Sequence, residues 1–254
     1  CAVMAMAEAK GPLLGMDGTR FTLDGKPVFL LGASYYGALG MEDEDALQKD
    51  LDDLAGHGFN WLRVWATWEA HGCHASAVES DGAAREPFMT RLERLCHLAG
   101  EKGLVVDVTV SRGLQPVFPD AFERHLVVIR TLAERLKPYR NVYFDVGNER
   151  NVGDARYVPM GEVKALVDAV KTIDPERLCT ASDGGDINEE GIKAYLESTS
   201  VDFICPHRPR HAASPAQTAD QTRWYLTQIE KASRVVPLHY QEPFRRGYGD
   251  WEPK

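Results

Sequence analysis

The sequence lacks the patterns that mark membrane-spanning or metal-binding proteins. No apolar run in it reaches the length of a transmembrane helix. Its five cysteines form no C-x-x-C pair and no cluster with histidine that would predict a metal site. The group most similar to a metal site consists of His71, Cys73 and His74. It has no fourth ligand beside it and is interpreted as part of a loop. Cys179 and Cys205 fall on expected strands, where cysteine acts as a small buried apolar residue.

Basic character and nucleotide-binding patterns are missing as well. The net charge is −9, which argues against a nucleic-acid partner and against binding to anionic membrane surfaces. No expected strand is followed by a glycine-rich phosphate loop, and no G-x-G-x-x-G is present. For a chain that alternates strands and helices, this absence favours a closed barrel over an open, doubly wound sheet.

The first ten residues, CAVMAMAEAK, differ in composition from the rest of the chain. They are small and apolar, and Ala7-Glu8-Ala9 fits the A-x-A pattern of a signal-peptidase site. Residues 1–10 are thus either the remnant of a secretion signal or a disordered, alanine-rich terminus. The first interpretation predicts a secreted or periplasmic protein, and the second a cytoplasmic one. Residues 11–254 are long enough for a single domain with a full core.

Short apolar strands alternate with amphipathic helices along the chain. A hairpin is expected first, over 13–23, with its turn at Asp17-Gly18. Seven strands are then expected at 28–34, 59–68, 104–110, 142–146, 178–182, 201–207 and 235–242. Helices are expected between them at 43–57, 87–102, 120–136, 160–173, 188–197 and 216–233. This order predicts an α/β fold, the (β/α)8 TIM barrel, lacking or truncated at its eighth β/α unit.

Polar side chains stand at the ends of two of these strands. Asn148 and Glu149 follow the strand at 142–146, and Glu242 ends the strand at 235–242. The carboxyl ends of barrel strands are where such folds keep their chemistry. The strand ends therefore predict that Glu149 and Glu242 lie opposite each other on one rim of the barrel.

Arg63 interrupts an otherwise apolar strand. Alternation places it on the same face as Trp61 and Trp65. A buried guanidinium without a partner is costly, so a partner is expected near it. We expect Arg63 to point to the rim of the two glutamates, within salt-bridge or one-water reach of Glu242.

Taken in their order along the chain, the motifs resemble those of clan A glycoside hydrolases. The resemblance is to family 5 in particular, which includes cellulases and mannanases. The resemblance covers residues 21–242. Arg63 in NWLRVW matches the family's arginine on strand two, and His207 in VDFICPH matches the histidine that ends strand six. Asn148-Glu149 matches the Asn-Glu pair that ends strand four, where the glutamate is the acid/base. Glu242 matches the nucleophile that ends strand seven.

Two features depart from the family pattern. Pro209 stands where many members carry an aromatic residue. The sequence also offers no strand eight after Glu242. Family members carry a tryptophan with strand eight, and Trp251 is too close to strand seven to replace it. An unpaired edge between strands seven and one would need a cover. We therefore expect this place to be open, filled by the N-terminal segment, or supplied by another chain in a homo-oligomer.

The resemblance implies a retaining glycosidase that cleaves a β-linked poly- or oligosaccharide by double displacement, without a metal or an organic cofactor. Glu242 would be ionised, helped by Arg63, and its charge would keep Glu149 protonated. Asn148 would donate to the sugar hydroxyl beside the reacting carbon. The expected substrate-binding residues, from the resemblance and from aromatic stacking, are Arg63, Asn148, His207, Trp65, Tyr35 and Tyr240, with Tyr36 and Trp68 as further stacking candidates.

A non-catalytic carbohydrate-binding barrel, a degenerate relative without strand eight, is the alternative to an enzyme. The presence of both Glu149 and Glu242 favours the enzyme, and the missing strand favours the binding protein. An aldolase-type barrel would need a Schiff-base lysine on a strand, and none of the expected strands offers one. The loops that would choose a sugar carry no readable pattern.

Overall fold

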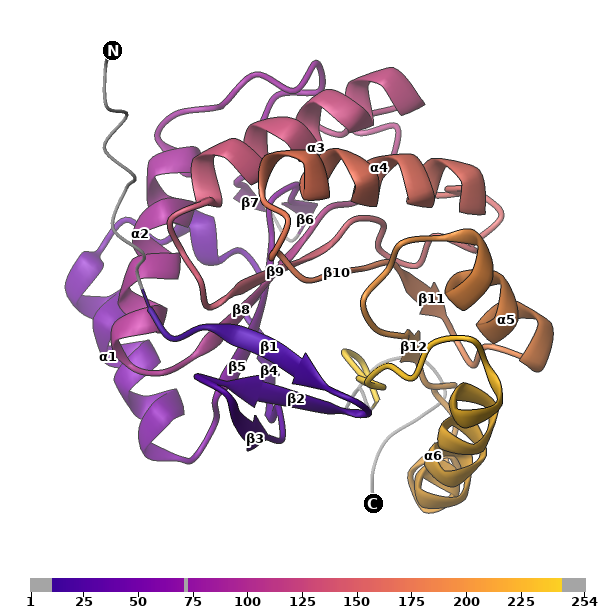
Figure 1. Ribbon diagram of the computed structural model, residues 1–254. Coiled ribbons are helices and arrows are strands. Elements are labelled where there is room, and N and C mark those ends of the chain that lie inside the picture. Colours follow the sequence, from indigo (N-terminus) through magenta and orange to yellow (C-terminus); the bar gives the residue numbers. More distant parts are fainter. Residues whose placement is uncertain (1–10, 71–72, 244–254) are drawn as a thin grey trace, which may run out of the picture.

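The computed structural model describes residues 11–70 and 73–243 (Figure 1). The expected signal remnant at 1–10, and the residues His71 and Trp251, lie outside the described residues. The helices are η1 (Ala38–Gly40), α1 (Glu44–Gly56), α2 (Phe88–Glu101), α3 (Phe122–Leu136), α4 (Met160–Ile173), α5 (Glu189–Ser198) and α6 (Ser214–Lys231). Across these residues, every helix falls short of the length or apolar character that crossing a bilayer requires.

The strands fall into an antiparallel hairpin region and a parallel set. The first holds β1 (Leu14–Asp17), β2 (Arg20–Leu23) and β3 (Lys26–Val28). The parallel set holds β4 (Gly32–Ser34), β5 (Trp61–Trp65), β8 (Val105–Thr109), β9 (Val142–Asp145), β10 (Cys179–Thr180), β11 (Ser182–Gly184) and β12 (Cys205–His207). A small two-stranded piece, β6 (Glu69–Ala70) and β7 (Cys73–His74), lies in the loop after β5.

The parallel strands form the centre of the molecule, and the helices surround them (Figure 1). Pairing runs in the order β4-β5-β8-β9-β10, and β11 pairs with β12. A parallel bridge between Ile204 and Leu238 then adds the segment that precedes Glu242. In the described part of the chain, no pairing joins this segment back to β4. The architecture is therefore the predicted (β/α) barrel, with strand positions one to seven in place.

Three predicted strands are divided or shortened. The first splits into β3, which joins the hairpin, and β4. Gly32 begins β4, where a Cβ atom would lie 1.7 Å from the carbonyl oxygen of Trp61, so only glycine permits this close pairing. The fifth splits into β10 and β11. The seventh is reduced to the bridge at Leu238, because Pro237 has no N–H to give to a ladder.

Side chains alternate along β5 as predicted. Leu62 and Val64 lie in the apolar layer between strands and helices, whereas Trp61 belongs to a separate cluster inside the barrel. Arg63 is fully buried and stands opposite Asp107 of β8 in the strand register. The predicted burial of the expected strand cysteines, Cys179 and Cys205, is also confirmed.

The hairpin closes one end of the barrel. Leu14 and Phe21 pack with Trp61 and Val105, which are the first residues of β5 and β8. Figure 1 shows β1 to β3 lying against the parallel strands. The hairpin therefore covers the amino-terminal ends of the strands and leaves their carboxyl ends for the polar residues.

Replacing Phe21 with alanine should lower the free energy of unfolding by about 3–5 kcal/mol, because it empties a filled core position. The Phe21 ring is 5% exposed and meets Phe203 edge-on, with ring centroids 5.0 Å apart. Phe29→Ala is the matched control, since Phe29 is 81% exposed and should change stability by less than about 0.5 kcal/mol. Urea unfolding measures both variants. An equal loss of stability in the two would contradict the role of the hairpin in closing one end of the barrel.

Candidate active site

The end of β9 is held in place by Asp145. Its Oδ1 accepts from the backbone N–H groups of Gly147 and Ser182, each at 3.1 Å. The Ser182 hydroxyl donates to Asp145 Oδ2 at 2.7 Å and accepts from the backbone N–H of Glu149 at 3.0 Å. Glu149 has a φ of 47°, an unusual backbone angle for a residue other than glycine. Such strain persists only where the surroundings fix it, and it is common at functional sites.

Arg63 joins the ends of several strands. Its Nη1 donates to Glu242 Oε1 at 2.5 Å, and its Nη2 donates to Asn148 Oδ1 at 2.7 Å and to Asp145 Oδ2 at 3.2 Å. Its Nε donates to the hydroxyl of Thr109 at 2.9 Å. The expected reach from Arg63 to Glu242 is thus a direct ion pair. Asn148 accepts with its oxygen, which leaves its amide nitrogen as the group that can donate to a ligand.

Glu149 and Glu242 meet on either side of His207. One ligand atom from each of these three side chains lies within 4.8 Å of the others. His207 Nδ1 is 3.3 Å from Glu149 Oε1 and 3.7 Å from Glu242 Oε1, and its Nε2 is 3.1 Å from Gln241 Oε1. Burial raises the pKa of Glu242, but the charges of Arg63, His207 and Arg210 outweigh it, and the net pKa lies below the usual value.

The same three side chains have the spacing of a metal-ligand set. Their carboxylate oxygens, however, already contact guanidinium groups. Arg63 and Arg210 contact Glu242, while Arg156 and Arg210 contact Glu149. Three guanidinium groups already balance the negative charge of the two carboxylates. The arrangement therefore suits acid/base or nucleophilic chemistry better than the binding of a metal cation.

Two of these arginines, Arg156 and Arg210, were not expected from the sequence. Arg156 Nη1 donates to Glu149 Oε2 at 2.7 Å, and Arg210 Nη2 lies 3.3 Å from Glu149 Oε1. With the hydrogen bond from His207 as the largest cause, these groups lower the pKa of Glu149 to about 2. The expectation that Glu242 keeps Glu149 protonated is therefore wrong for the protein alone. The hydrogen bond and the positive charges around Glu149 outweigh its burial, which by itself would raise its pKa.

Further polar groups lie below Arg63 inside the barrel. Asp107 is fully buried and accepts from the hydroxyl of Tyr143 at 2.9 Å and from the side-chain amide of Gln241. Burial raises the pKa of Asp107 to about 7, although Arg63 acts in the opposite direction. The sequence did contain a signal for Asp107 and Asp145, since each is an acidic residue within an apolar strand. Arg156 and Arg210 come from loops, where no periodicity marks them.

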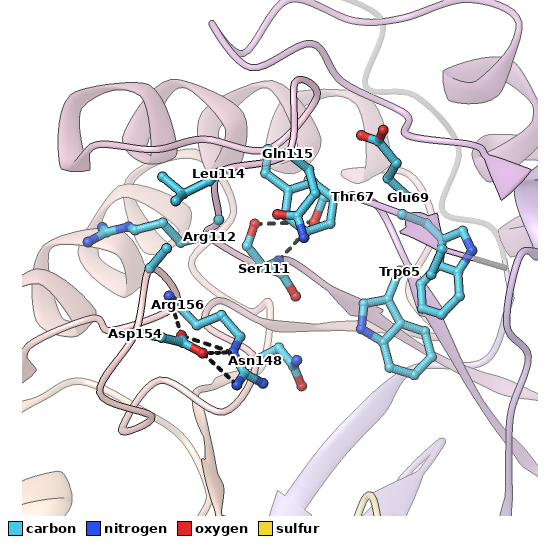
Figure 2. Close-up of a pocket in the computed structure, with 15 residues that line it drawn as sticks. Trp65, Thr67, Glu69, Ser111, Arg112, Leu114, Gln115, Asn148, Asp154 and Arg156 are labelled. Atoms are coloured by element: carbon cyan, nitrogen blue, oxygen red, sulfur yellow. Dashed lines mark hydrogen bonds and ion pairs between the residues drawn. The ribbon is translucent and has the colours of Figure 1, made fainter. Parts of the chain in front are cut away.

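A pocket of about 570 Å³ lies beside Asn148, which contacts Arg63, and Arg156, which contacts Glu149. Figure 2 shows Asn148 and Arg156 on one side of it and Trp65 on the other. The ring of Tyr36 stacks on Trp65 with centroids 4.8 Å apart, and Trp68 also lines the pocket. The glutamates themselves are not among the lining residues, so the pocket reaches them through Asn148 and Arg156.

Two expected substrate-binding residues point elsewhere. The hydroxyl of Tyr35 donates to Asp50 of α1 at 2.6 Å. The hydroxyl of Tyr240 lies 3.0 Å from that of Thr222 on α6. Tyr240 faces the helices because its neighbour Gln241 turns into the barrel. These positions do not support a role for Tyr35 or Tyr240 in binding substrate, whereas Tyr36 stacks on Trp65, which lines the pocket.

The chain has the (β/α) barrel fold of glycoside hydrolases. No protein-family model and no curated protein sequence matches it. Among solved structures, it is similar to a glycoside hydrolase family 5 mannosidase from Rhizomucor miehei in complex with mannosyl-fructose. The identity is 14% and the TM-score 0.70, over 95% of this chain and 74% of that one.

Two further solved structures are similar. An endo-1,4-β-mannanase from Rhizomucor miehei has 16% identity and a TM-score of 0.65, over 89% of this chain and 80% of that one. A family 5 glycoside hydrolase from Bacteroides vulgatus has 15% identity and a TM-score of 0.68, over 95% of this chain and 57% of that one. At these identities the similarity shows the fold.

The ion pairs of Glu149 should make the free energy of unfolding depend on pH. A carboxylate whose pKa falls to about 2 on folding stabilises the protein above its ordinary pKa, and this contribution is lost as the pH falls from about 4.5 to 2. At pH 6, Glu149→Gln should therefore be less stable than the parent by about 3 kcal/mol, and at pH 2 the difference should be close to zero. Urea unfolding at several pH values measures it.

Glu134→Gln is the matched control. Glu134 is an exposed carboxylate on α3. Its replacement should shift stability by less than about 0.5 kcal/mol at either pH. If the two variants show the same pH dependence, the ion pairs of Glu149 contribute nothing to stability.

Proposed function

We propose that the protein is a retaining glycosidase that acts on a β-linked poly- or oligosaccharide, with Glu242 as nucleophile and Glu149 as acid/base. The observation that carries this proposal is the close approach of the two carboxylates, since one oxygen of Glu149 lies within 4.8 Å of one oxygen of Glu242. Direct attack on the sugar requires carboxylates about 5–5.5 Å apart, whereas inversion needs about 6.5–9.5 Å to admit a water. The short spacing supports double displacement.

Each group fits a step of that reaction. The ionised Glu242, held by Arg63, attacks the anomeric carbon and forms a glycosyl ester while the bond to the leaving oxygen breaks. Glu149 gives its proton to that oxygen. A water then attacks the ester, losing its proton to Glu149, and Glu242 leaves as a carboxylate. The free amide nitrogen of Asn148 donates to the hydroxyl beside the reacting carbon.

The pocket suggests how the sugar is held. Its volume of about 570 Å³ lies within the usual range for small-molecule sites. Tyr36, Trp65 and Trp68 form an aromatic group on which an apolar sugar face can stack. Because two of the similar structures are a mannosidase and a mannanase, β-mannosides are the first substrates to test.

Replacing Glu242 with alanine should reduce turnover of an aryl β-mannoside or of β-mannan to background, because no covalent intermediate can form. Glu149→Ala should lower kcat by roughly 10²–10⁴-fold on substrates with poor leaving groups and much less on activated aryl glycosides. Azide should restore rate to Glu149→Ala and give a glycosyl azide of retained configuration. Release of 4-nitrophenol and NMR of the azide product measure these effects.

Glu134→Ala serves as the control, since this exposed carboxylate should leave turnover unchanged. Full activity in both glutamate variants would show that the site is wrongly assigned. An azide of inverted configuration would exclude the double-displacement mechanism. Tight sugar binding without any hydrolysis by the parent protein would favour the non-catalytic carbohydrate-binding barrel.

A further inference from the structure

Arg210 lies between the two glutamates. Its Nη2 contacts Glu242 Oε2 and lies 3.3 Å from Glu149 Oε1. The Arg210 side chain is 30% exposed, whereas Arg63 is fully buried. Arg210 comes from the loop between β12 and α6, so it can leave the glutamates without opening the interior of the barrel.

This position conflicts with a bound sugar. In direct attack the anomeric carbon approaches Glu242 while the leaving oxygen approaches Glu149. A sugar ring and a guanidinium cannot share the narrow space between them, so Arg210 must move aside before reaction. The contacts that Arg210 gives up are charge-assisted and therefore strong. A neutral sugar offers it only hydroxyl groups in exchange.

Arg156, the other partly exposed guanidinium, is anchored differently. It donates to Glu149 Oε2 through Nη1, but its Nε and Nη2 hold Asp154 at 3.1 and 2.8 Å. Figure 2 shows Arg156 and Asp154 together at the edge of the pocket, beside Asn148. Arg156 keeps Asp154 as its acidic partner when a ligand binds. Arg210 is therefore the cation that needs a new anionic partner.

We infer that the substrate carries an anionic group, a carboxylate or a sulfate ester, on the sugar that enters between the glutamates, and that this group becomes the partner of Arg210. The inference rests on the proposed glycosidase function. A guanidinium binds a carboxylate through two parallel hydrogen bonds and binds sulfate through the same charge attraction. The exchange replaces one ion pair with another and leaves no cation unpaired.

The exchange also prepares Glu149 for its task. When Arg210 turns to the substrate, Glu149 loses one positive neighbour and gains a negative one nearby, and both changes favour its protonated form. Glu149 then takes a proton from solvent and can give it to the leaving oxygen. The low pKa of Glu149 in the protein alone is thereby reconciled with acid catalysis.

The test compares matched 4-nitrophenyl β-glycosides of the gluco and manno series. Within each series the sugar carries at C6 a hydroxymethyl group, a carboxylate or a sulfate ester. An anionic member should exceed the neutral one in kcat/KM by about tenfold or more, the size expected for a charge-assisted contact. Arg210→Gln should reduce this ratio by about tenfold or more, and Arg210→Lys should retain part of it. Comparison of the carboxylate and sulfate-ester glycosides identifies which anion the site prefers.

Arg223→Gln is the matched control, because Arg223 is an exposed arginine of α6 that pairs with Asp220. It should leave the ratio unchanged. Calorimetry with the free sugars, glucuronate and mannuronate against glucose and mannose, measures the same preference as binding. There too the uronates should bind the parent protein more tightly, and Arg210→Gln should remove the difference.

The outcomes separate the two proposals. Equal kcat/KM for neutral and anionic members, or a preference that survives Arg210→Gln, would overturn the inference and leave the glycosidase function intact. Absence of hydrolysis on every glycoside and polysaccharide would overturn the proposed function. In that event, calorimetry still decides whether Arg210 selects an anionic sugar, and equal binding of uronates and neutral sugars would reject it.

Discussion

The buried guanidinium of Arg63 is the interaction on which the rest of the site depends. It is fully buried and donates to Glu242, Asn148, Asp145 and Thr109. A charge removed from water destabilises a protein unless good geometry and a full set of hydrogen bonds offset the lost hydration. Strands β5, β8 and β9 and the segment at Leu238 must therefore be in register before this charge can be buried. The same contact places Glu242 and holds it ionised.

The site surrounds its two glutamates with positive charge, and this has opposite consequences for them. The arrangement suits the proposed role of Glu242, because a nucleophile must be ionised. It opposes the proposed acid role of Glu149, whose pKa it lowers to about 2. In the proposed mechanism, the ion pairs that stabilise Glu149 in the protein alone are thus the ones that substrate rearranges. Stability and activity often conflict in this way at functional sites.

Local periodicity predicted most of the fold. Helix α4 begins and ends at the predicted residues, and α1 and α2 differ from prediction by one residue at each end. These elements have strong apolar spacing, which depends only on neighbours in sequence. The strands were predicted less well at their ends, where pairing decides. Gly32 begins β4 because of the carbonyl of Trp61, and Pro237 interrupts the last strand.

The sequence by itself determined the alternation of strands and helices, the inward direction of Arg63, and the place of Glu149 and Glu242 at strand ends. Each of these follows from spacing within one element. Only the tertiary structure decided which loop side chains reach the glutamates. Arg210 meets Glu149 across 61 residues of chain, while Tyr35 and Tyr240 turn to the helices instead. A loop has no period that fixes where its side chains point, so the charges around Glu149, and with them its pKa, arise only when the barrel brings distant loops together.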